Sequence, residues 1–292
     1  MPQSLFVQKR KFLKTKIMTL VIIQRKKDVV TFNSDSRISF GNEGCFDQGA
    51  KLFEVPVRLK APAKSVEDLE KWDYELTYGM AVTGSSLNAY ALKESISQIL
   101  SHIVYYSNFS DISIIGLGHF VLGRFKDITK KLAAVLGPGA LSEIILGGYC
   151  IVENKIRILR FFADVSHEIE FKFEEILTSD GLFCTGNGRP HAEAVLSEHG
   201  DLTPLQTIKT VIDNKMEKSV GGVLQHGIFR DRHFCLSGVS EEIISEETGE
   251  TKKTSHFLGF ELSTQKITND YPMLFISYST TPVDWKHPKW QS

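Results

Sequence analysis

The sequence predicts an α+β fold in which two antiparallel β-sheets lie between two layers of helices. Three features of the 292-residue chain support this fold. Short apolar runs with strand-like patterning come first, two long stretches with helical periodicity follow, and a second group of strands and shorter helices comes after them. Segregated strands and helices are typical of two packed sheets covered by helices.

The composition predicts an ordinary globular protein. The chain is 42% hydrophobic and 24% charged, and its formal net charge is −1, so no global field favours a nucleic acid or a membrane as a partner. Four cysteines are widely spaced without a CxxC pair, which predicts neither a zinc site nor a disulfide framework, and we expect a reducing cytoplasmic location. No apolar run approaches the length of a membrane span.

The first part of the chain predicts a small sheet. Two apolar runs, Leu20–Ile23 and Val29–Phe32, flank a polar turn at 24–28, which is typical of a β-hairpin. A third strand should begin near Lys51, and a loop rich in Pro, Lys and Glu should follow it at 56–72.

The middle and last parts alternate between helices and strands. A strand at 74–82 should lead through a turn into a helix reaching about residue 106, and Gly137-Pro138-Gly139 should end a second helix at 112–136. The later elements should be a hairpin from 142–152 and 155–162, helices at 190–198 and 204–218, and strands at 223–229, 256–262 and 273–278.

Three polar residues at equal spacing stand on the first three predicted strands. Thr19, Asp35 and Lys51 are separated by 35 − 19 = 16 and 51 − 35 = 16 residues, so the sheet could bring them to a common edge. A Thr hydroxyl is a weak nucleophile until a base takes its proton. If the chain begins at Thr19, its own α-amine, with an ordinary pKa of about 7.7–8.0, can be that base. The Lys would lower the amine's pKa and stabilise charge on the hydroxyl oxygen, and the Asp would orient the Lys.

In these positions the chain resembles the proteasome β-subunits and the bacterial peptidase HslV, which are N-terminal-nucleophile (Ntn) hydrolases. The matching pieces are Met18-Thr19 before a strand, Ser34-Asp35-Ser36-Arg37 with Gly41 after it, and the run 49–54. The resemblance covers residues 18–238 and implies a four-layer αββα sandwich. Without it, Thr19 would be an ordinary strand residue and Asp35–Lys51 an ordinary ion pair.

The resemblance implies further site residues. Thr83 and Gly84 stand where the family supplies a backbone N–H to the oxyanion, although Gly84 also fits a simple turn. Asn187 replaces the Ser of a Gly-Ser-Gly turn, and Glu217 replaces an Asp that supports the site. Val220 replaces a further Ser and cannot hydrogen-bond through its side chain.

We divide the chain into three parts. Residues 1–18 are a leader, which is either a propeptide removed by autoprocessing or the product of a start codon assigned too early, with Met18 as the true start. Residues 19–238 form the proteasome-like domain, and 239–292 are a C-terminal extension packed on it.

The resemblance implies a threonine-type peptidase that acts on polypeptides inside a homo-oligomeric ring. It implies no metal or organic cofactor, and it leaves room for an ATP-dependent unfoldase as a partner. Two alternatives stay open. One is a non-catalytic structural subunit, which the leader, Asn187 and Val220 favour. The other is an Ntn amidase that acts on a small molecule, because fold and nucleophile do not fix the substrate.

Overall fold

The computed structural model describes residues 19–40, 44–165, 169–244, 251–261 and 279–283, so the strand predicted at 273–278 lies outside the described residues. The described helices are α1 (Ser86–Leu100), α2 (Ile114–Leu136), α3 (Arg189–Glu198) and α4 (Pro204–Asp213), with 3-10 turns η1 (Val66–Asp68) and η2 (Gly137–Ala140). The strands are β1 (Val21–Lys26), β2 (Val29–Asp35), β3 (Ile38–Ser39), β4 (Cys45–Phe46), β5 (Leu52–Lys60), β6 (Tyr74–Gly84), β7 (Ile103–Val104), β8 (Ser142–Cys150), β9 (Lys155–Asp164), β10 (Glu170–Ile176), β11 (Gly181–Thr185), β12 (Leu224–Arg230), β13 (His233–Ile244), β14 (Thr251–Phe257), β15 (Phe260–Glu261) and β16 (Thr280–Val283).

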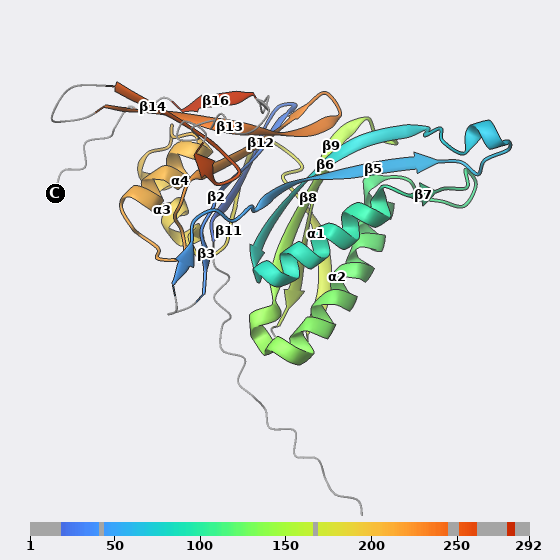
Figure 1. The fold of residues 1–292 in the computed structure, drawn as a ribbon, viewed down its shortest axis with the longest axis horizontal. Coiled ribbons are helices and arrows are strands. Elements are labelled where there is room, and N and C mark those ends of the chain that lie inside the picture. Colours follow the sequence, from blue (N-terminus) through green and yellow to red (C-terminus); the bar gives the residue numbers. More distant parts are fainter. Residues whose placement is uncertain (1–18, 41–43, 166–168, 245–250, 262–278, 284–292) are drawn as a thin grey trace, which may run out of the picture.

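A single sheet dominates the described part of the molecule. It contains 14 strands, and its main path runs β10-β9-β8-β6-β13-β12-β2-β1-β11 (Figure 1). The predicted four-layer αββα sandwich with two separate sheets was therefore wrong. The long strand β13 causes the difference, because it pairs antiparallel with β12 and also meets β6 in parallel at His233 and Thr77. That bridge joins the two strand arrays into one continuous mixed sheet.

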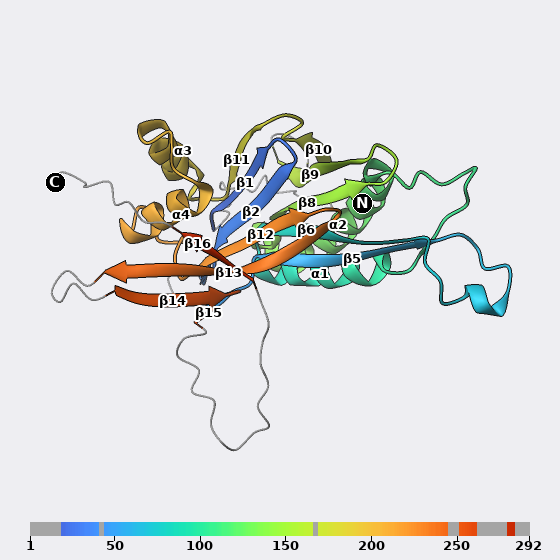
Figure 2. The same ribbon diagram turned by 90° about the horizontal axis from the view of Figure 1, so that it is seen from above.

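The sheet curls so that one part packs against another. Apolar side chains of β1 and β2, such as Ile23 and Phe32, share a core with Ile145 of β8 and Ile158 of β9. Helices α1 and α2 cover the outer surface of β5, β6 and β8, while α3 and α4 pack on β1, β11 and β12. Figures 1 and 2 show the two helix pairs on opposite parts of the sheet.

Local sequence explains most of the helix boundaries. Ser85, Ser113 and Thr203 each cap a helix by accepting a hydrogen bond from a backbone N–H in its first turn. The helix predicted at 204–218 ends early, at Asp213. Lys215 takes a φ of 50° and the N–H of Met216 returns to the carbonyl of Val211, which closes the helix. Residues 214–222 are thereby released as a loop that runs toward Asp35.

The described C-terminal strands belong to the same sheet and form a layer beside α4. Strand β13 runs without a break through residue 238, and its second half pairs with β14 and with β16 (Figure 2). Val239 and Val283 from this layer join the core around α4. A division of the chain at residue 238 stays a prediction. Within the described residues, no helix combines the length and the apolar character that a membrane span needs.

A buried histidine in this sheet predicts pH-dependent stability. His226 on β12 is 6% exposed, its Nδ1 lies 2.8 Å from Oδ1 of Asn33, and burial lowers its pKa to about 4. As the pH falls, the unfolded chain therefore binds a proton at His226 at a higher pH than the folded chain does. The free energy of unfolding should fall by about 3 kcal/mol as the pH drops from about 6.5 to about 4. Urea titrations of His226→Gln should lose this part of the slope, whereas the exposed-site control His102→Gln should keep it. Equal slopes in both variants would contradict the assignment.

Candidate active site

The structure brings Thr19, Asp35 and Lys51 together where β1 and β5 begin and β2 ends. Thr19 lies just before β1, Asp35 ends β2, and Lys51 lies just before β5. The Thr19 hydroxyl donates to Oδ1 of Asp35 at 2.7 Å, and the Lys51 ammonium donates to the same oxygen at 2.8 Å. Lys51 Nζ also contacts Oγ1 of Thr19 directly. All three residues are at most 5% exposed.

Asp35 is the centre of this arrangement. Besides the two side-chain contacts, its carboxylate accepts backbone N–H donors from Leu20 at 3.0 Å, Arg37 at 3.1 Å and Gly221 at 3.0 Å. Both oxygens are thus saturated with donors, as a fully buried carboxylate requires. The same hydrogen bonds tie the start of β1, the end of β2 and the loop after α4 to one point.

The Lys51 ammonium is held in an environment that disfavours its charge. Burial lowers the pKa of Lys51 below its usual value, while the neighbouring Asp35 carboxylate opposes that shift. A buried ammonium against a hydroxyl oxygen stabilises negative charge there more strongly than one in water. Lys51 is therefore suited to activate the Thr19 hydroxyl.

The turn after β11 binds and packs against the backbone of Thr19. The N–H of Gly188 donates to the carbonyl of Thr19 at 3.1 Å. Gly186 has a φ of 93°, and a Cβ at this position would lie 2.2 Å from the Thr19 carbonyl oxygen, so only glycine fits. Thr19 itself has a φ of 140°, which is strained for a β-branched residue.

The predicted supporting residues lie at different places. Thr83 and Gly84 end β6 and line the same cavity as Thr19, and among the described residues the buried Thr83 hydroxyl has no hydrogen-bond partner. Asn187 lies in the turn that holds Thr19, but its side chain makes no hydrogen bond to a described residue. Glu217 accepts from the N–H and hydroxyl of Ser219 at 3.1 and 3.0 Å, so it shapes the 217–221 loop rather than contacting Thr19.

Two side chains hold the segment before Lys51. One is Gln225, which the sequence did not single out, and the other is Arg37, which belongs to the matching piece 34–37. The amide of Gln225, on β12, accepts from the N–H of Lys51 at 2.9 Å and donates to the carbonyl of Gly49 at 2.7 Å. Arg37 forms a two-pronged ion pair with Asp47, at 2.6 and 2.9 Å. Gln225 is followed by His226 in β12, so its polarity did not single it out in the sequence. The strand pattern of β12 did not indicate that Gln225 binds the backbone of Gly49 and Lys51.

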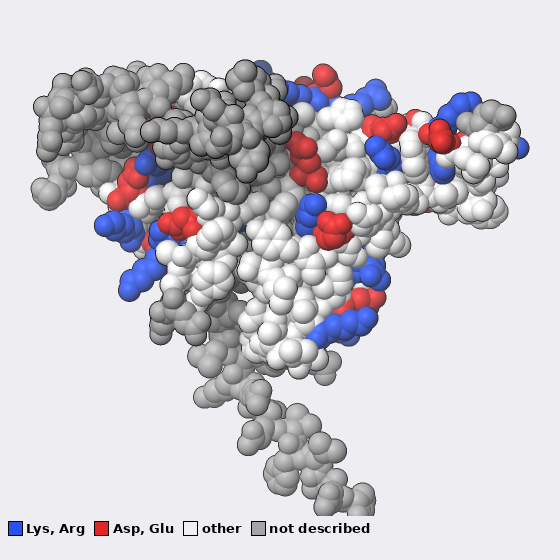
Figure 3. Space-filling model, viewed as in Figure 1, with Lys and Arg blue, Asp and Glu red and all other residues white. Residues whose placement is uncertain are grey.

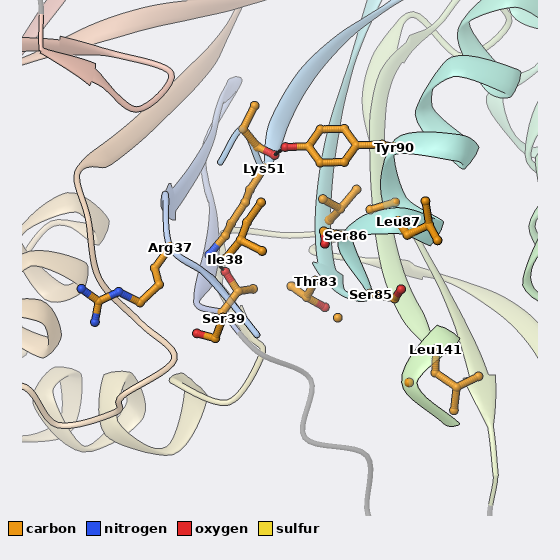
Figure 4. A pocket seen from close by; sticks show the side chains of 16 residues that line it. Arg37, Ile38, Ser39, Lys51, Thr83, Ser85, Ser86, Leu87, Tyr90 and Leu141 are labelled. Carbon is orange, nitrogen blue, oxygen red and sulfur yellow. Dashed lines mark hydrogen bonds between the residues drawn. The ribbon is translucent and has the colours of Figure 1, made fainter. Parts of the chain in front are cut away.

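A cavity of about 210 Å³ opens beside Thr19. Figure 4 shows Lys51 and Ser39 on one side and Thr83, Ser85 and Ser86 on the other. Its remaining walls are mostly apolar and come from Ile38, Ala50, Val82, Leu87, Ala89, Tyr90 and Leu141. Among the described residues, no group of three or more His, Cys, Asp and Glu side chains is arranged to hold a metal ion.

With this geometry established, comparisons with known proteins bear on the fold. No protein-family model matches the sequence, and no curated protein matches it. Among solved structures, the Anbu complex from Pseudomonas aeruginosa, solved as a helical assembly, matches with a TM-score of 0.52 at 12% identity over 75% of this chain and 85% of that one. Anbu from Yersinia bercovieri, described as an ancestral beta-subunit, matches with a TM-score of 0.52 at 14% identity over 75% of this chain and 86% of that one.

The chain has the fold of Anbu. The assignment of the sequence to the family of proteasome β-subunits and HslV was therefore wrong. Both of these structural matches are to Anbu rather than to proteasome β-subunits or HslV, and the continuous mixed sheet departs from the sandwich expected for that family. At 12–14% identity the likeness to Anbu concerns the fold alone, so the function has to be argued from the site.

Proposed function

We propose that this chain is a threonine-type peptidase whose nucleophile is the Thr19 hydroxyl, active once Thr19 is the N-terminal residue. The observation that carries the proposal is the contact of Lys51 Nζ with Oγ1 of Thr19 beside the open cavity. An ordinary structural ion pair would need neither the hydroxyl nor the cavity. The strained φ of 140° at Thr19 adds support, because that dihedral no longer exists when the chain begins at Thr19.

The reaction follows from these groups. The free α-amine of Thr19 takes the hydroxyl proton, while the Lys51 ammonium stabilises the developing alkoxide. The oxygen attacks the carbonyl carbon of a peptide bond lying in the cavity. The proton then passes from the amine to the leaving amino group, which leaves an ester on Thr19. Water activated by the same amine hydrolyses the ester and restores the hydroxyl.

Gly84 is the proposed backbone donor to the oxyanion. The N–H of Val82 donates to the carbonyl of Lys51, on the side of β6 that faces β5. Backbone N–H groups alternate along a strand, so the N–H of residue 84 points to the same side, just beyond the start of β5. There it borders the cavity. The next N–H, of Ser85, is already bonded to the carbonyl of Leu141 at 2.9 Å.

The nucleophile can be tested with chains that start at different residues. A chain beginning at Thr19 should cleave fluorogenic peptides. Thr19→Ala and Lys51→Met should each reduce kcat/KM by about 10²-fold or more, because each loses an essential catalytic term. A β-lactone inhibitor should add its mass to Thr19. A chain kept at Met1 should be inactive, since an amide nitrogen is no base. Activity that survives Thr19→Ala would favour another site, and a folded Thr19 chain without labelling would favour the non-catalytic subunit.

The cavity supports uncharged side chains of moderate size as the substrate class. Its two lining cations are already paired, Arg37 with Asp47 and Lys51 with Asp35, so no described lining charge is left to neutralise a substrate charge. Tyr90 closes one end, because its hydroxyl donates to the carbonyl of Ala50 at 3.1 Å and its ring packs on Phe53 (Figure 4). A cavity of about 150 Å³ is filled by benzene alone. The observed 210 Å³ must also hold the scissile peptide unit.

Peptides that differ only in the residue before the scissile bond test this substrate class. Ala and Val should exceed Phe in kcat/KM by about 10-fold or more, and Lys and Glu should be the poorest. Tyr90→Ala should raise kcat/KM for Phe and remove the preference. Tyr90→Phe keeps the ring and should retain it. Fast cleavage after Lys or Glu by the wild-type chain would contradict the assignment.

We also propose that the peptidase is a homo-oligomer. An exposed peptidase would threaten other proteins of the cytoplasm, where four free thiols suit a reducing milieu. Figure 3 shows an uncharged surface over the beginning of α1, with charges of both signs beside it. Leu87 on α1 and Val135 on α2 are 56% and 81% exposed, which suits contact with a second copy. The polypeptide substrate and an ATP-dependent unfoldase stay predictions.

Native mass spectrometry tests the assembly. The particle should be several-fold heavier than the 32.8 kDa chain. Val135→Asp should dissociate it, because a buried unpaired charge in an interface is costly. Val152→Asp, at an exposed turn between β8 and β9, is the matched control and should leave the particle intact. A monodisperse and fully active monomer would favour the amidase acting on a small molecule.

A further inference from the structure

The turn between β14 and β15 packs directly on the segment that leads to Lys51. Leu258 and Gly259 form this turn, with φ values of 48° and 94°. Gly259 is buried, and a Cβ at this position would lie 2.9 Å from Cα, 3.0 Å from C and 3.1 Å from O of Gln48. These are backbone atoms, so the contact is between two main chains and no side chain can move aside. The C-terminal region therefore reaches the active-site segment through one glycine.

The opposite side of the segment is fixed to the site. The N–H of Gly49 donates to the carbonyl of Ser36 at 2.9 Å, next to Asp35. Gln225 holds both the carbonyl of Gly49 and the N–H of Lys51. Residues 47–51 thus lie between β2 and β12 on the inside and the β14–β15 turn on the outside. Gln48, which Gly259 contacts, is three residues from Lys51.

We propose that the β14–β15 turn is a positioning element for catalysis, in which Gly259 supports residues 47–49 from outside and so keeps the Lys51 ammonium against Thr19 Oγ1. The inference rests on the proposed function and assigns a task to the C-terminal region. Lys51 acts on the hydroxyl through direct contact, and small displacements of catalytic groups have large effects on rate. Gly259 does not line the cavity in the described structure, so the turn acts on the site only through the segment that it supports.

The methyl group that Gly259→Ala adds should push the β14–β15 turn away from residues 47–49. The turn is held by the two residue pairs of β15, whereas residues 47–51 are held by several hydrogen bonds to β2 and β12. The turn is the weaker side, so it should withdraw and leave Lys51 without its outer support. Gly123 on α2 offers a matched control, because a Cβ there meets nothing within 4 Å.

The experiment compares Gly259→Ala with Gly123→Ala in full chains that begin at Thr19. Titration with a covalent inhibitor counts the competent sites, and kcat is expressed per titrated site. Gly259→Ala should lower this kcat by about 10-fold or more with little change in KM, whereas Gly123→Ala should match the wild type. A merely structural contact would lower Tm and the number of sites but not the rate at each site. A per-site kcat equal to the wild type would overturn the inference.

A second readout needs no turnover. The α-amine of Thr19 can be titrated by its pH-dependent reaction with an acylating reagent, located by peptide mass mapping. Its pKa should be below the usual value of about 7.7–8.0 in the wild type, because Lys51 is near, and should rise in Gly259→Ala. Leu258→Gly adds no Cβ and only loosens the turn, so it should shift the amine in the same direction if Gly259→Ala does not fold. An unchanged amine in both variants refutes the positioning role. A shifted amine without peptidase activity in any chain refutes only the proposed function.

Discussion

The buried carboxylate of Asp35 is the group on which the geometry of the site depends. It is fully shielded from water and accepts five hydrogen bonds, from Thr19, Leu20, Arg37, Lys51 and Gly221. A buried carboxylate that lacks a hydrogen-bond donor is destabilising. Removing any one of the five donors would therefore cost free energy, which holds each donor in place. The donors come from the residues just before β1, just after β2 and just before β5, and from the loop after α4. One carboxylate thus fixes the relative positions of four chain segments, two of which carry the proposed nucleophile Thr19 and the ammonium of Lys51.

A second buried carboxylate connects Thr19 to the other part of the sheet. Glu143 on β8 is 4% exposed, accepts the Thr185 hydroxyl of β11 at 2.6 Å and pairs with Arg160 of β9 at 2.7 Å. Thr185 is the last residue before the turn that grips the Thr19 carbonyl. The two carboxylates therefore act on different sides of Thr19, Asp35 on its side chain and Glu143 on the turn against its backbone. This arrangement explains how a residue at the end of a strand stays ordered without a long run of ladder hydrogen bonds.

The sequence predicted that Thr19, Asp35 and Lys51 lie together, from their equal spacing and from the family resemblance. Hairpin pairing accounts for Thr19 and Asp35, which lie just before β1 and at the end of β2, whereas Lys51 precedes β5, which pairs with β6 rather than with β1 or β2. Gln225, Glu143 and Arg160 were out of reach, because their partners lie 174, 42 and 17 residues away and nothing local signals the pairing. The continuous sheet was missed for the same reason. It depends on one bridge between His233 and Thr77, while the patterns of β6 and β13 fit separate sheets equally well.

The early end of α4 illustrates a different limit. The apolar pattern suggests a helix to about residue 218, but Lys215 adopts a left-handed conformation without the Gly or Asn that usually marks it. The loop that follows brings the N–H of Gly221 to Asp35, so the demand of the buried carboxylate outweighs local propensity. Glu217 was expected to support the site because it stands where the resemblance places an Asp. In the loop its carboxylate instead satisfies Ser219, and its effect on Thr19 passes through the position of Gly221.

On the proposed mechanism, the peptide bond between residues 18 and 19 decides whether the same side-chain arrangement is catalytically inactive or active. While residue 18 is attached, the nitrogen of Thr19 belongs to an amide and cannot take the hydroxyl proton. The Lys51 contact, the Asp35 hydrogen bonds and the cavity need no rearrangement when that bond is cut. Cleavage supplies the base and removes the dihedral that is strained at 140°. The chemistry and the backbone strain therefore favour the same product, a chain that begins at Thr19 with its site already assembled.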